Sequence, residues 1–460
     1  MKPTILVAIV AAAVIYSADA KKDKDVVTVD ATLDELGNTS PTYAPTTSTY
    51  APTIGEPEAS TPAPTKTSTP KPTAKKAGTP TYIPTYSPTN VLEPTPKGFL
   101  GNGLVDIPEL GIRLDSSLTA TQIAKVGQKV QLKDGLSTLN WHAWMDGATS
   151  IALPNGDHVY VSNSEDDDGG VYGLYFDTEG NPYDYKQLLS GTTWNCSGGK
   201  TPWLTWVSCE EREQGQCWEI DPNPSSENHG EPQKTILGGS VGGQFEAVAV
   251  HDSDELDGPT FFVTEDRTDG ALRRVETSCR GWDALKIGGC PSTTTYLRFL
   301  DNPRFEWTTD VALGRQSASK HYPNTEGIVY NNGKLSFISK VGYVMFTLDF
   351  DTMTWTRERT GKAKLIGEGS FAGQPDGVIS GFNQRYMYFT EEEERGNGMY
   401  ARDEYGMYYT VFEAMSGQFV GDETVGLAIS PDGKTMYVGY QENGVLFALK
   451  RNDNQVWERK

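Results

Sequence analysis

Residues 195–211 of the chain read Asn-Cys-Ser-Gly-Gly-Lys-Thr-Pro-Trp-Leu-Thr-Trp-Val-Ser-Cys-Glu-Glu. A thiol and two glycines come first, a Thr-Pro-Trp corner follows, and a short run then ends in two adjacent carboxylates. Aromatic and β-branched residues in that run favour a strand, because their side chains fit a pleated surface. The stretch therefore predicts a loop-and-strand unit with reactive side chains at both ends.

Similar units recur along the chain at intervals near fifty residues. One marker is an acidic residue that opens a β run, as in Asp146-Gly-Ala148, Glu246-Ala-Val248, Glu326-Gly-Ile328, Asp376-Gly-Val378 and Glu423-Thr-Val425. The second marker is a later β run that ends beside carboxylates, as in Val161–Asp166, Val207–Glu211, Val263–Asp266 and Phe389–Glu392. Turn dipeptides such as Asn155-Gly and Asp432-Gly precede several of these second runs, which is typical of hairpins.

Units of forty to fifty residues with four short strands are typical of β-propeller blades. We therefore expect an all-β fold with six blades, counting Thr201-Pro-Trp203 as a degenerate opening, and an insertion between Glu246 and Glu326. The alternative is a seventh blade inside that interval. A pair of β-sandwiches is the competing fold, but it gives no reason for corresponding strands to end in carboxylates. A helix is expected only over Thr119–Gln131.

The N-terminal part of the chain has a different composition. Residues 1–20 resemble a secretory signal peptide, with an apolar run over Ile5–Ile15 and a cleavage site after Ala20. Residues 21–97 are rich in Pro, Thr and Ser, which predicts a disordered, extended stalk. The stalk is either a passive spacer or an attachment to a cell wall or matrix. The propeller is expected over residues 98–460, in a secreted, extracellular protein without a transmembrane segment in its mature form.

The formal charge of −21 argues against nucleic acid as a partner and favours cations. In a propeller, equivalent positions of successive blades face one axis. The carboxylates expected there are Glu165, Glu210 or Glu211, Glu246, Glu265, Glu326, Asp376 and Glu423. Crowded carboxylates raise one another's pKa unless cations intervene. Calcium accepts six to eight oxygen ligands, whereas a thiolate from Cys196 would favour a softer metal such as iron.

Five cysteines occur in the chain, and disulfides persist in secreted proteins. The short spacings of Cys209/Cys217 and Cys279/Cys290 suggest two local bridges, which leave Cys196 as a single thiol. A Cys196–Cys209 bridge, or a Cys196 thiol that is merely buried, remains an alternative.

Taken together, these motifs resemble the PhoX-type secreted alkaline phosphatases, a β-propeller family that binds calcium and iron. The most specific block is Asn195-Cys-Ser-Gly-Gly with Thr201-Pro-Trp, Thr205-Trp and Cys209-Glu-Glu211. Supporting matches are Asn163-Ser-Glu165, Thr264-Glu-Asp266, Glu326-Gly, Asp422-Glu-Thr-Val-Gly, Ser430-Pro-Asp-Gly433 and Gln441. The resemblance covers the chain from Gly98 to its C-terminus.

The resemblance implies Cys196 as an iron ligand and carboxylate ligands at Glu165, Glu210, Glu265 and Glu326, with the choice between Glu210 and Glu211 open. It also implies catalytic positions at Glu326 and Asn324. Three departures stand out: Ser164 replaces a histidine of the family's Asn-His-Glu motif, Asn324 replaces its phosphate-binding arginine, and Glu442 replaces the histidine of a late Gln-His-Pro-Gly. Positive charge would then come from metals or from Lys200, Arg267, Arg315 or Lys320.

The resulting expectation is a secreted, metal-dependent phosphatase for small phosphate esters. The departures remove cationic or well-placed groups while the carboxylates largely survive, so metal binding is better supported than catalysis. The alternative is a non-catalytic, metal-stabilised propeller that binds a wall polymer or another protein. A third interpretation is a calcium-dependent lactonase or other hydrolase, since a fold does not fix a function.

Overall fold

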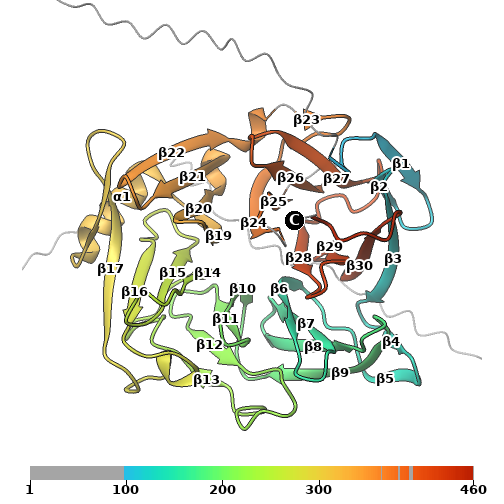
Figure 1. Cartoon of the computed structure of the whole chain (residues 1–460), viewed down its shortest axis with the longest axis horizontal. Coiled ribbons are helices and arrows are strands. Elements are labelled where there is room, and N and C mark those ends of the chain that lie inside the picture. Colours follow the sequence, from blue (N-terminus) through green and yellow to red (C-terminus); the bar gives the residue numbers. More distant parts are fainter. Residues whose placement is uncertain (1–97, 364, 382–383, 393–396, 459–460) are drawn as a thin grey trace, which may run out of the picture. The chain divides into compact units, whose positions relative to one another are not determined.

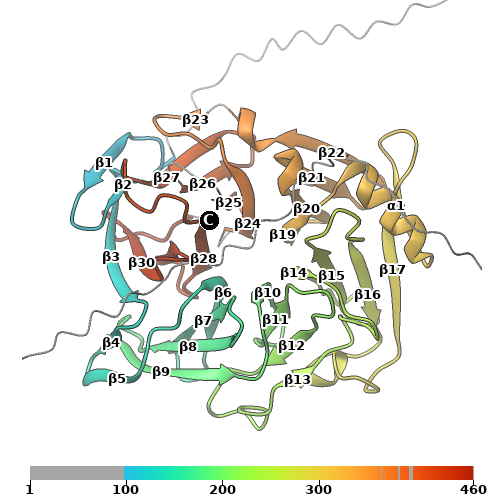
Figure 2. The ribbon, with the colours of Figure 1, turned by 180° about the vertical axis from the view of Figure 1, so that it is seen from behind.

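The computed structural model describes residues 98–363, 365–381, 384–392 and 397–458. The predicted signal peptide and stalk lie outside these residues. Apart from a two-stranded ribbon of β4 (Lys129–Leu132) and β5 (Gly135–Asn140), the described strands form six sheets. Figure 1 shows the sheets arranged around one axis, and Figure 2 shows the same ring from behind. The all-β propeller prediction is confirmed.

The first three blades follow one another along the chain. Blade 1 contains β6 (Met145–Ala152), β7 (His158–Ser164), β8 (Gly170–Phe176) and β9 (Pro182–Leu189). Blade 2 contains β10 (Asn195–Lys200), β11 (Trp206–Glu210), β12 (Cys217–Ile220) and β13 (Gln233–Lys234). Blade 3 contains β14 (Phe245–His251), β15 (Thr260–Glu265), β16 (Arg273–Thr277), β17 (Ser292–Phe299) and β18 (Phe305–Thr308).

The last three blades complete the ring. Blade 4 contains β19 (Thr325–Asn331), β20 (Lys334–Ser339), β21 (Val344–Asp349) and β22 (Thr354–Arg359). Blade 5 contains β24 (Gln374–Ser380), β25 (Tyr386–Glu392), β26 (Gly398–Asp403) and β27 (Tyr408–Ala414), extended by β1 (Leu104–Ile107), β2 (Ile112–Asp115) and β23 (Leu365–Ile366). Blade 6 contains β28 (Thr424–Ile429), β29 (Thr435–Tyr440), β30 (Val445–Arg451) and β3 (Leu118–Lys125).

The innermost strands are β6, β10, β14, β19, β24 and β28, and each contacts the next around the ring, with β28 returning to β6. Antiparallel pairing of β3 with β30 closes the ring, because it joins the start of the described chain to its end. Buried side chains fill the spaces between adjacent blades. Phe262, Phe337 and Phe346, for example, belong to one cluster shared by blades 3 and 4.

Thr119–Gln131 was expected to be helical, and this prediction is wrong. The segment forms β3 and most of β4. Its β-branched threonines lie where β30 offers an unpaired edge, so tertiary pairing overrides the weak local helical pattern. Among the described residues the α-helix is instead α1 (Val311–His321), which is capped by the Asp310 side chain.

The long interval between Glu246 and Glu326 contains an insertion and no further blade. It holds the additional strand β18, the short helix η1 (Trp282–Ala284) and α1. Two other short helices, η2 (Lys340–Gly342) and η3 (Thr360–Lys362), flank β21 and β22 in blade 4. No helix among the described residues is long and apolar enough to span a membrane.

Both predicted disulfides are present: Cys209–Cys217 joins β11 to β12, and Cys279–Cys290 closes the loop between β16 and β17. Cys196 is free and buried. Replacing Cys209 and Cys217 with alanine is expected to lower the free energy of unfolding by about 2–3 kcal/mol, because a short loop is no longer closed in the unfolded chain. Denaturant titration of the double variant measures this, and an unchanged midpoint would contradict it.

Candidate metal centre

A β-bulge interrupts the innermost strand of each blade at the same place. The register with the second strand shifts at 145/148, 195/198, 245/248, 325/328, 375/378 and 425/428. A bulge leaves residues outside the ladder and redirects their side chains. The first residue in each bulge, here called the bulge position, is in blade order Asp146, Cys196, Glu246, Glu326, Asp376 and Gly426.

A second set of equivalent residues stands at the end of each second strand. In blade 1 the Glu165 amide donates a hydrogen bond to the Trp144 carbonyl oxygen at 2.7 Å, and Lys340 donates in the same way to Asn324 at 3.0 Å. Corresponding bonds place one such residue in blades 2 and 3, and ladder pairing with Gln374 places Glu392 in blade 5. These strand-end positions are Glu165, Glu211, Asp266, Lys340 and Glu392, and in blade 6 the amide of Gln441 bonds to Glu423, one residue beyond the equivalent pair.

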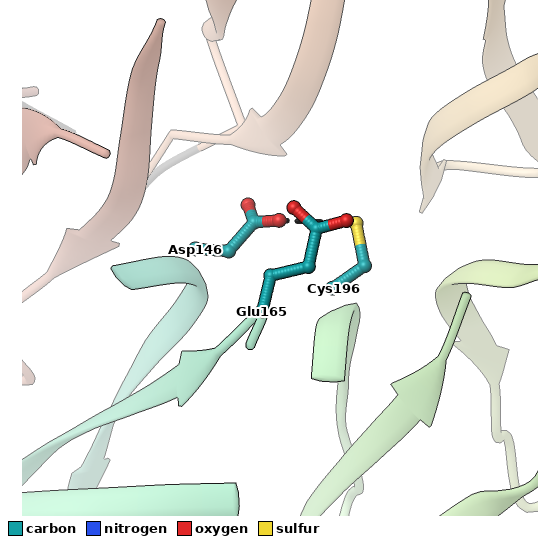
Figure 3. A group of neighbouring side chains, drawn as sticks. All are labelled: Asp146, Glu165 and Cys196. Atoms are coloured by element: carbon teal, nitrogen blue, oxygen red, sulfur yellow. Dashed lines mark hydrogen bonds between the residues drawn. The ribbon is translucent and has the colours of Figure 1, made fainter. Parts of the chain in front are cut away.

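The two sets of positions converge on three groups of metal-ligand type. The groups are Asp146, Glu165 and Cys196; Cys196, Glu211 and Glu246; and Glu246, Glu326 and Asp376. In each group, one ligand atom per residue lies within 4.8 Å of the others. Together these seven residues are called the axial cluster. Figure 3 shows the first group, with the Cys196 sulfur directed toward the carboxylates.

Cys196 belongs to two of the groups. Its thiol is within hydrogen-bond distance of Asp146 Oδ2, at 3.0 Å, and of Glu246 Oε2, at 2.9 Å. Asp146 and Glu246 come from the blades on either side of Cys196 in the ring. The thiol therefore links the two carboxylates, as a shared ligand between two cation sites would.

Burial and mutual repulsion disfavour negative charge in the axial cluster. Burial first, and then Asp146 and Glu246, raise the pKa of the Cys196 thiol well above its usual range. The pKa of Glu246 is raised by burial and by Glu326, and burial raises the pKa of Asp376 to about 6. Carboxylates in such a setting must bind protons or cations.

One positively charged side chain contacts the axial cluster. The Lys340 ammonium lies 2.8 Å from Glu326 Oε1 and 2.9 Å from Asp266 Oδ2, and its side chain is only 16% exposed. Burial opposes this charge, but Glu326 and Asp266 outweigh it and raise the pKa of Lys340 well above its usual range. Lys340 is therefore a permanent cation at neutral pH.

Of the ligands implied by resemblance, Cys196, Glu165 and Glu326 are brought together in the axial cluster, whereas Glu210 and Glu265 are not. Glu210 accepts hydrogen bonds from the Thr193 and Gln216 amides, and so stabilises its own hairpin. Glu265 contacts Arg315 at 3.4 Å. Both stand one residue before the strand-end position, and successive side chains of a strand point to opposite faces. Glu211, the alternative left open beside Glu210, belongs to the axial cluster, and Asp266 rather than Glu265 holds the strand-end position of blade 3.

Asp146 joins the cluster although it did not belong to the implied ligand set. Glu246 and Asp376 were expected near the axis and do belong to the axial cluster, and Glu423 interacts electrostatically with Asp376. A signal for Asp146 was present in the sequence. Asp146, Cys196 and Glu246 are each separated by 50 residues, as are Glu326 and Asp376.

The three residues that depart from the family pattern each make a defined hydrogen bond. The Ser164 hydroxyl donates to the Ala143 carbonyl at 2.8 Å. The Asn324 amide donates to Asp266 Oδ1 at 2.7 Å, and its backbone is left-handed, with a φ of 53°. Glu442 donates its amide to Asp422, and the preceding Gln441 donates to Glu165 Oε2 at 2.8 Å.

Three of the four cations suggested from the sequence contact groups outside the axial cluster. Lys200 is near the Ser150 carbonyl, and Arg267 pairs with Asp269 at 2.6 Å. Arg315 pairs with Glu265 and Asp269, and Lys320 lies on α1. Lys340, whose sequence neighbours carry no acidic motif, supplies a positive charge in their place.

The donor set fits metal ions. Buried carboxylate oxygens match the preference of hard cations, and one thiol shared by two groups adds a softer ligand. The fold and this arrangement define a β-propeller with an acidic, thiol-containing site of metal-binding type at its axis.

Comparisons with known proteins lead to the same class. The family model "Alkaline phosphatase PhoX" matches residues 177–269, which include the Cys196 block. PhoX from Pseudomonas fluorescens, solved in complex with vanadate, a transition state analogue, matches with 14% identity and a TM-score of 0.56, over 78% of this chain and 99% of that one. The PhoX-type resemblance is thereby confirmed over residues 177–269, and the chain is similar to PhoX in its β-propeller fold.

A protein of unknown function from Bacteroides thetaiotaomicron also matches, with 11% identity and a TM-score of 0.43, over 72% of this chain and 76% of that one. No curated protein matches the sequence.

Proposed function

We propose that the chain is a secreted, metal-dependent phosphatase that hydrolyses small phosphate monoesters at the axial cluster. The observation that carries the proposal is the pair of ligand groups that share the Cys196 thiol. The family match over residues 177–269 includes this thiol and Glu211, which supports phosphatase chemistry over other activities on the same fold.

Two of the three groups are assigned a metal in this proposal. Asp146, Glu165 and Cys196 would hold iron, because only groups with a thiolate offer a soft ligand. Glu246, Glu326 and Asp376 offer oxygen ligands alone and would hold calcium. Bound metal ions would neutralise the substrate phosphate and lower the pKa of a water ligand.

The protein's own groups prepare the site for this chemistry. Cys196 must release its proton before it can serve as a ligand, and its two carboxylate neighbours provide acceptors for that proton. Gln441 orients Glu165 through the bond to Oε2. Asn324 and Lys340 both contact Asp266, so this carboxylate fixes an amide and an ammonium close to Glu326.

Phosphate release from a generic phosphate monoester tests the proposal. Protein supplied with calcium and iron is expected to release phosphate, and chelation is expected to lower the rate at least tenfold, with recovery when metal is returned. Glu326→Gln should lower the rate, whereas Glu306→Gln, which affects an exposed pair with Arg298, should not. Metal-replete protein without chelator-sensitive phosphate release would overturn the proposal.

A second candidate function is a non-catalytic, metal-stabilised propeller that binds an extracellular or cell-wall partner. The specific observation in its favour is the uncharged amide of Asn324 at the position of the family's phosphate-binding arginine. This candidate predicts metal binding without phosphatase activity, and so the same assay separates the two.

Asn324→Arg shows whether the site hydrolyses phosphate esters without the family's arginine or has lost this activity together with the arginine. For an active protein we expect kcat/KM to rise about tenfold, because a charged donor would add about 1.4 kcal/mol toward phosphate. A stability loss of about 1 kcal/mol should accompany it, since residue 324 has a left-handed backbone that suits asparagine. Activity that appears only in the variant would favour the second candidate, and activity that falls would contradict the assigned role of residue 324.

A further inference from the structure

Lys340 occupies a position that carries a carboxylate in most other blades. The strand-end residues of blades 1, 2, 3 and 5 are Glu165, Glu211, Asp266 and Glu392. Lys340 is tied to the backbone by the same amide-to-carbonyl bond as its counterparts. Blade 4 therefore has an ammonium at the position where most other blades have a carboxylate, and its backbone there has the same conformation-defining hydrogen bond.

The ligand groups follow a rule that shows what this exchange does. The first two groups each combine a bulge residue, the strand-end residue of the same blade, and the next bulge residue: Asp146, Glu165 and Cys196, then Cys196, Glu211 and Glu246. Applied to blade 4, the rule selects Glu326, Lys340 and Asp376. The group found nearby, Glu246, Glu326 and Asp376, consists of bulge residues alone.

The contacts of Lys340 resemble those of a bound cation. Its ammonium nitrogen has carboxylate oxygens of Glu326 and Asp266 at 2.8 and 2.9 Å and one of Glu392 at 3.4 Å. Glu326 and Asp266 are almost fully buried, with exposed fractions of 2% and 1%. Buried carboxylates of this kind require a nearby positive charge.

We propose that Lys340 of blade 4 is a built-in cation that takes the place of one metal ion. It lies between Asp266 of blade 3 and Glu326 of blade 4. The rest of the axial cluster remains available to exchangeable metals. The inference rests on the proposed function in one respect, namely that the wild-type protein binds metal ions in this cluster. The blade 4 corner then stays neutralised when metals are chelated, because its cation is covalently attached.

The direct test is metal stoichiometry in the Lys340→Glu variant. This change restores a carboxylate at the strand-end position, and the variant is expected to bind one more divalent cation per chain than wild type in elemental analysis after loading with calcium. Lys334→Met is the matched control, because Lys334 begins strand β20, which directly precedes Lys340, but it is exposed and pairs with half-buried Asp349 at 3.5 Å. The control should bind as many ions as wild type.

Lys340→Met supplies a second readout that does not depend on activity. Its thermal midpoint in chelator is expected to fall by 5 °C or more relative to wild type, and added calcium should raise the midpoint further than it does in wild type. An equal calcium response in wild type and Lys340→Met, or an unchanged ion count in folded Lys340→Glu, would overturn the inference.

The possible outcomes separate this inference from the proposed function. Metal in wild type with no extra ion in Lys340→Glu overturns the inference alone. An ion in Lys340→Glu with none in wild type supports the inference and contradicts the proposed function. Absence of metal from both proteins overturns both.

Discussion

Replacing Cys196 with alanine is expected to remove iron from the protein and to lower phosphatase activity on the order of a thousandfold, equivalent to about 4 kcal/mol of transition-state stabilisation. The reason is the position of the thiol in two ligand groups, with Asp146 on one side and Glu246 on the other. Its loss leaves two neighbouring sites with only carboxylate ligands, which hold calcium better than a softer metal.

Paired measurements of iron content and phosphate release test this prediction. Cys196→Ser is the matched control for side-chain size, and it too should lose iron because a hydroxyl is a harder and weaker ligand than a thiolate. Thermal denaturation shows whether each variant is folded. Full iron content and full activity in folded Cys196→Ala would contradict the assigned role of the thiol.

Removal of the metals is expected to make stability depend strongly on pH. In the metal-free protein, burial raises the pKa of Asp146 and Glu246 well above their usual values and that of Asp376 to about 6. A carboxyl whose pKa is higher in the folded state stabilises the fold below its unfolded pKa, near 4. This contribution is lost as pH rises through the folded pKa. Asp376 alone accounts for about 3 kcal/mol between pH 4 and 6, at about 1.4 kcal/mol per pKa unit, and roughly half of this is lost above pH 5.

Thermal denaturation of chelated protein should therefore show a midpoint on the order of 5–10 °C lower at pH 8 than at pH 5. Calcium added at pH 8 should restore the midpoint, because bound cations replace the protons in neutralising the cluster. The metal-loaded protein is the control, and its midpoint should change little over this range. A chelated protein that is more stable at pH 8 than at pH 5 would contradict this account of the cluster.

The sequence predicted the propeller because blade repeats leave a visible period. Acidic openings such as Glu246-Ala-Val and Glu326-Gly-Ile, each before a β run, were sufficient to place the innermost strands. The insertion was located correctly, but its helix α1 was not predicted, and a helix was instead predicted in the ring-closing strand β3. Closure depends on pairing between the two ends of the described chain, which local patterns do not contain.

For the ligand set, the sequence left the choice between Glu210 and Glu211 open and selected Glu265 where Asp266 holds the strand-end position. Glu210 and Glu211 are adjacent and chemically alike, as are Glu265 and Asp266, so residue type alone cannot choose between them. The choice depends on strand alternation and on where the ladder ends, and both are properties of pairing. The amide bonds from Glu211 to Trp194 and from Asp266 to Gln244 identify the strand-end residues.

Lys340 was not predicted because it follows Ser339 without any acidic motif. Its role depends on the carboxylates of Asp266 and Glu326, which approach it only after blades 3 and 4 have packed together. By contrast, the 50-residue separation of Asp146, Cys196 and Glu246 is visible in the sequence. This spacing predicts that Asp146 belongs to the cluster.

Elemental analysis of protein purified without chelator shows directly whether the axial cluster is a metal centre. We expect both iron and calcium to accompany the folded chain, with the iron lost in Cys196→Ala. Folded protein that contains neither metal, and that takes up neither when both are supplied, would contradict the account.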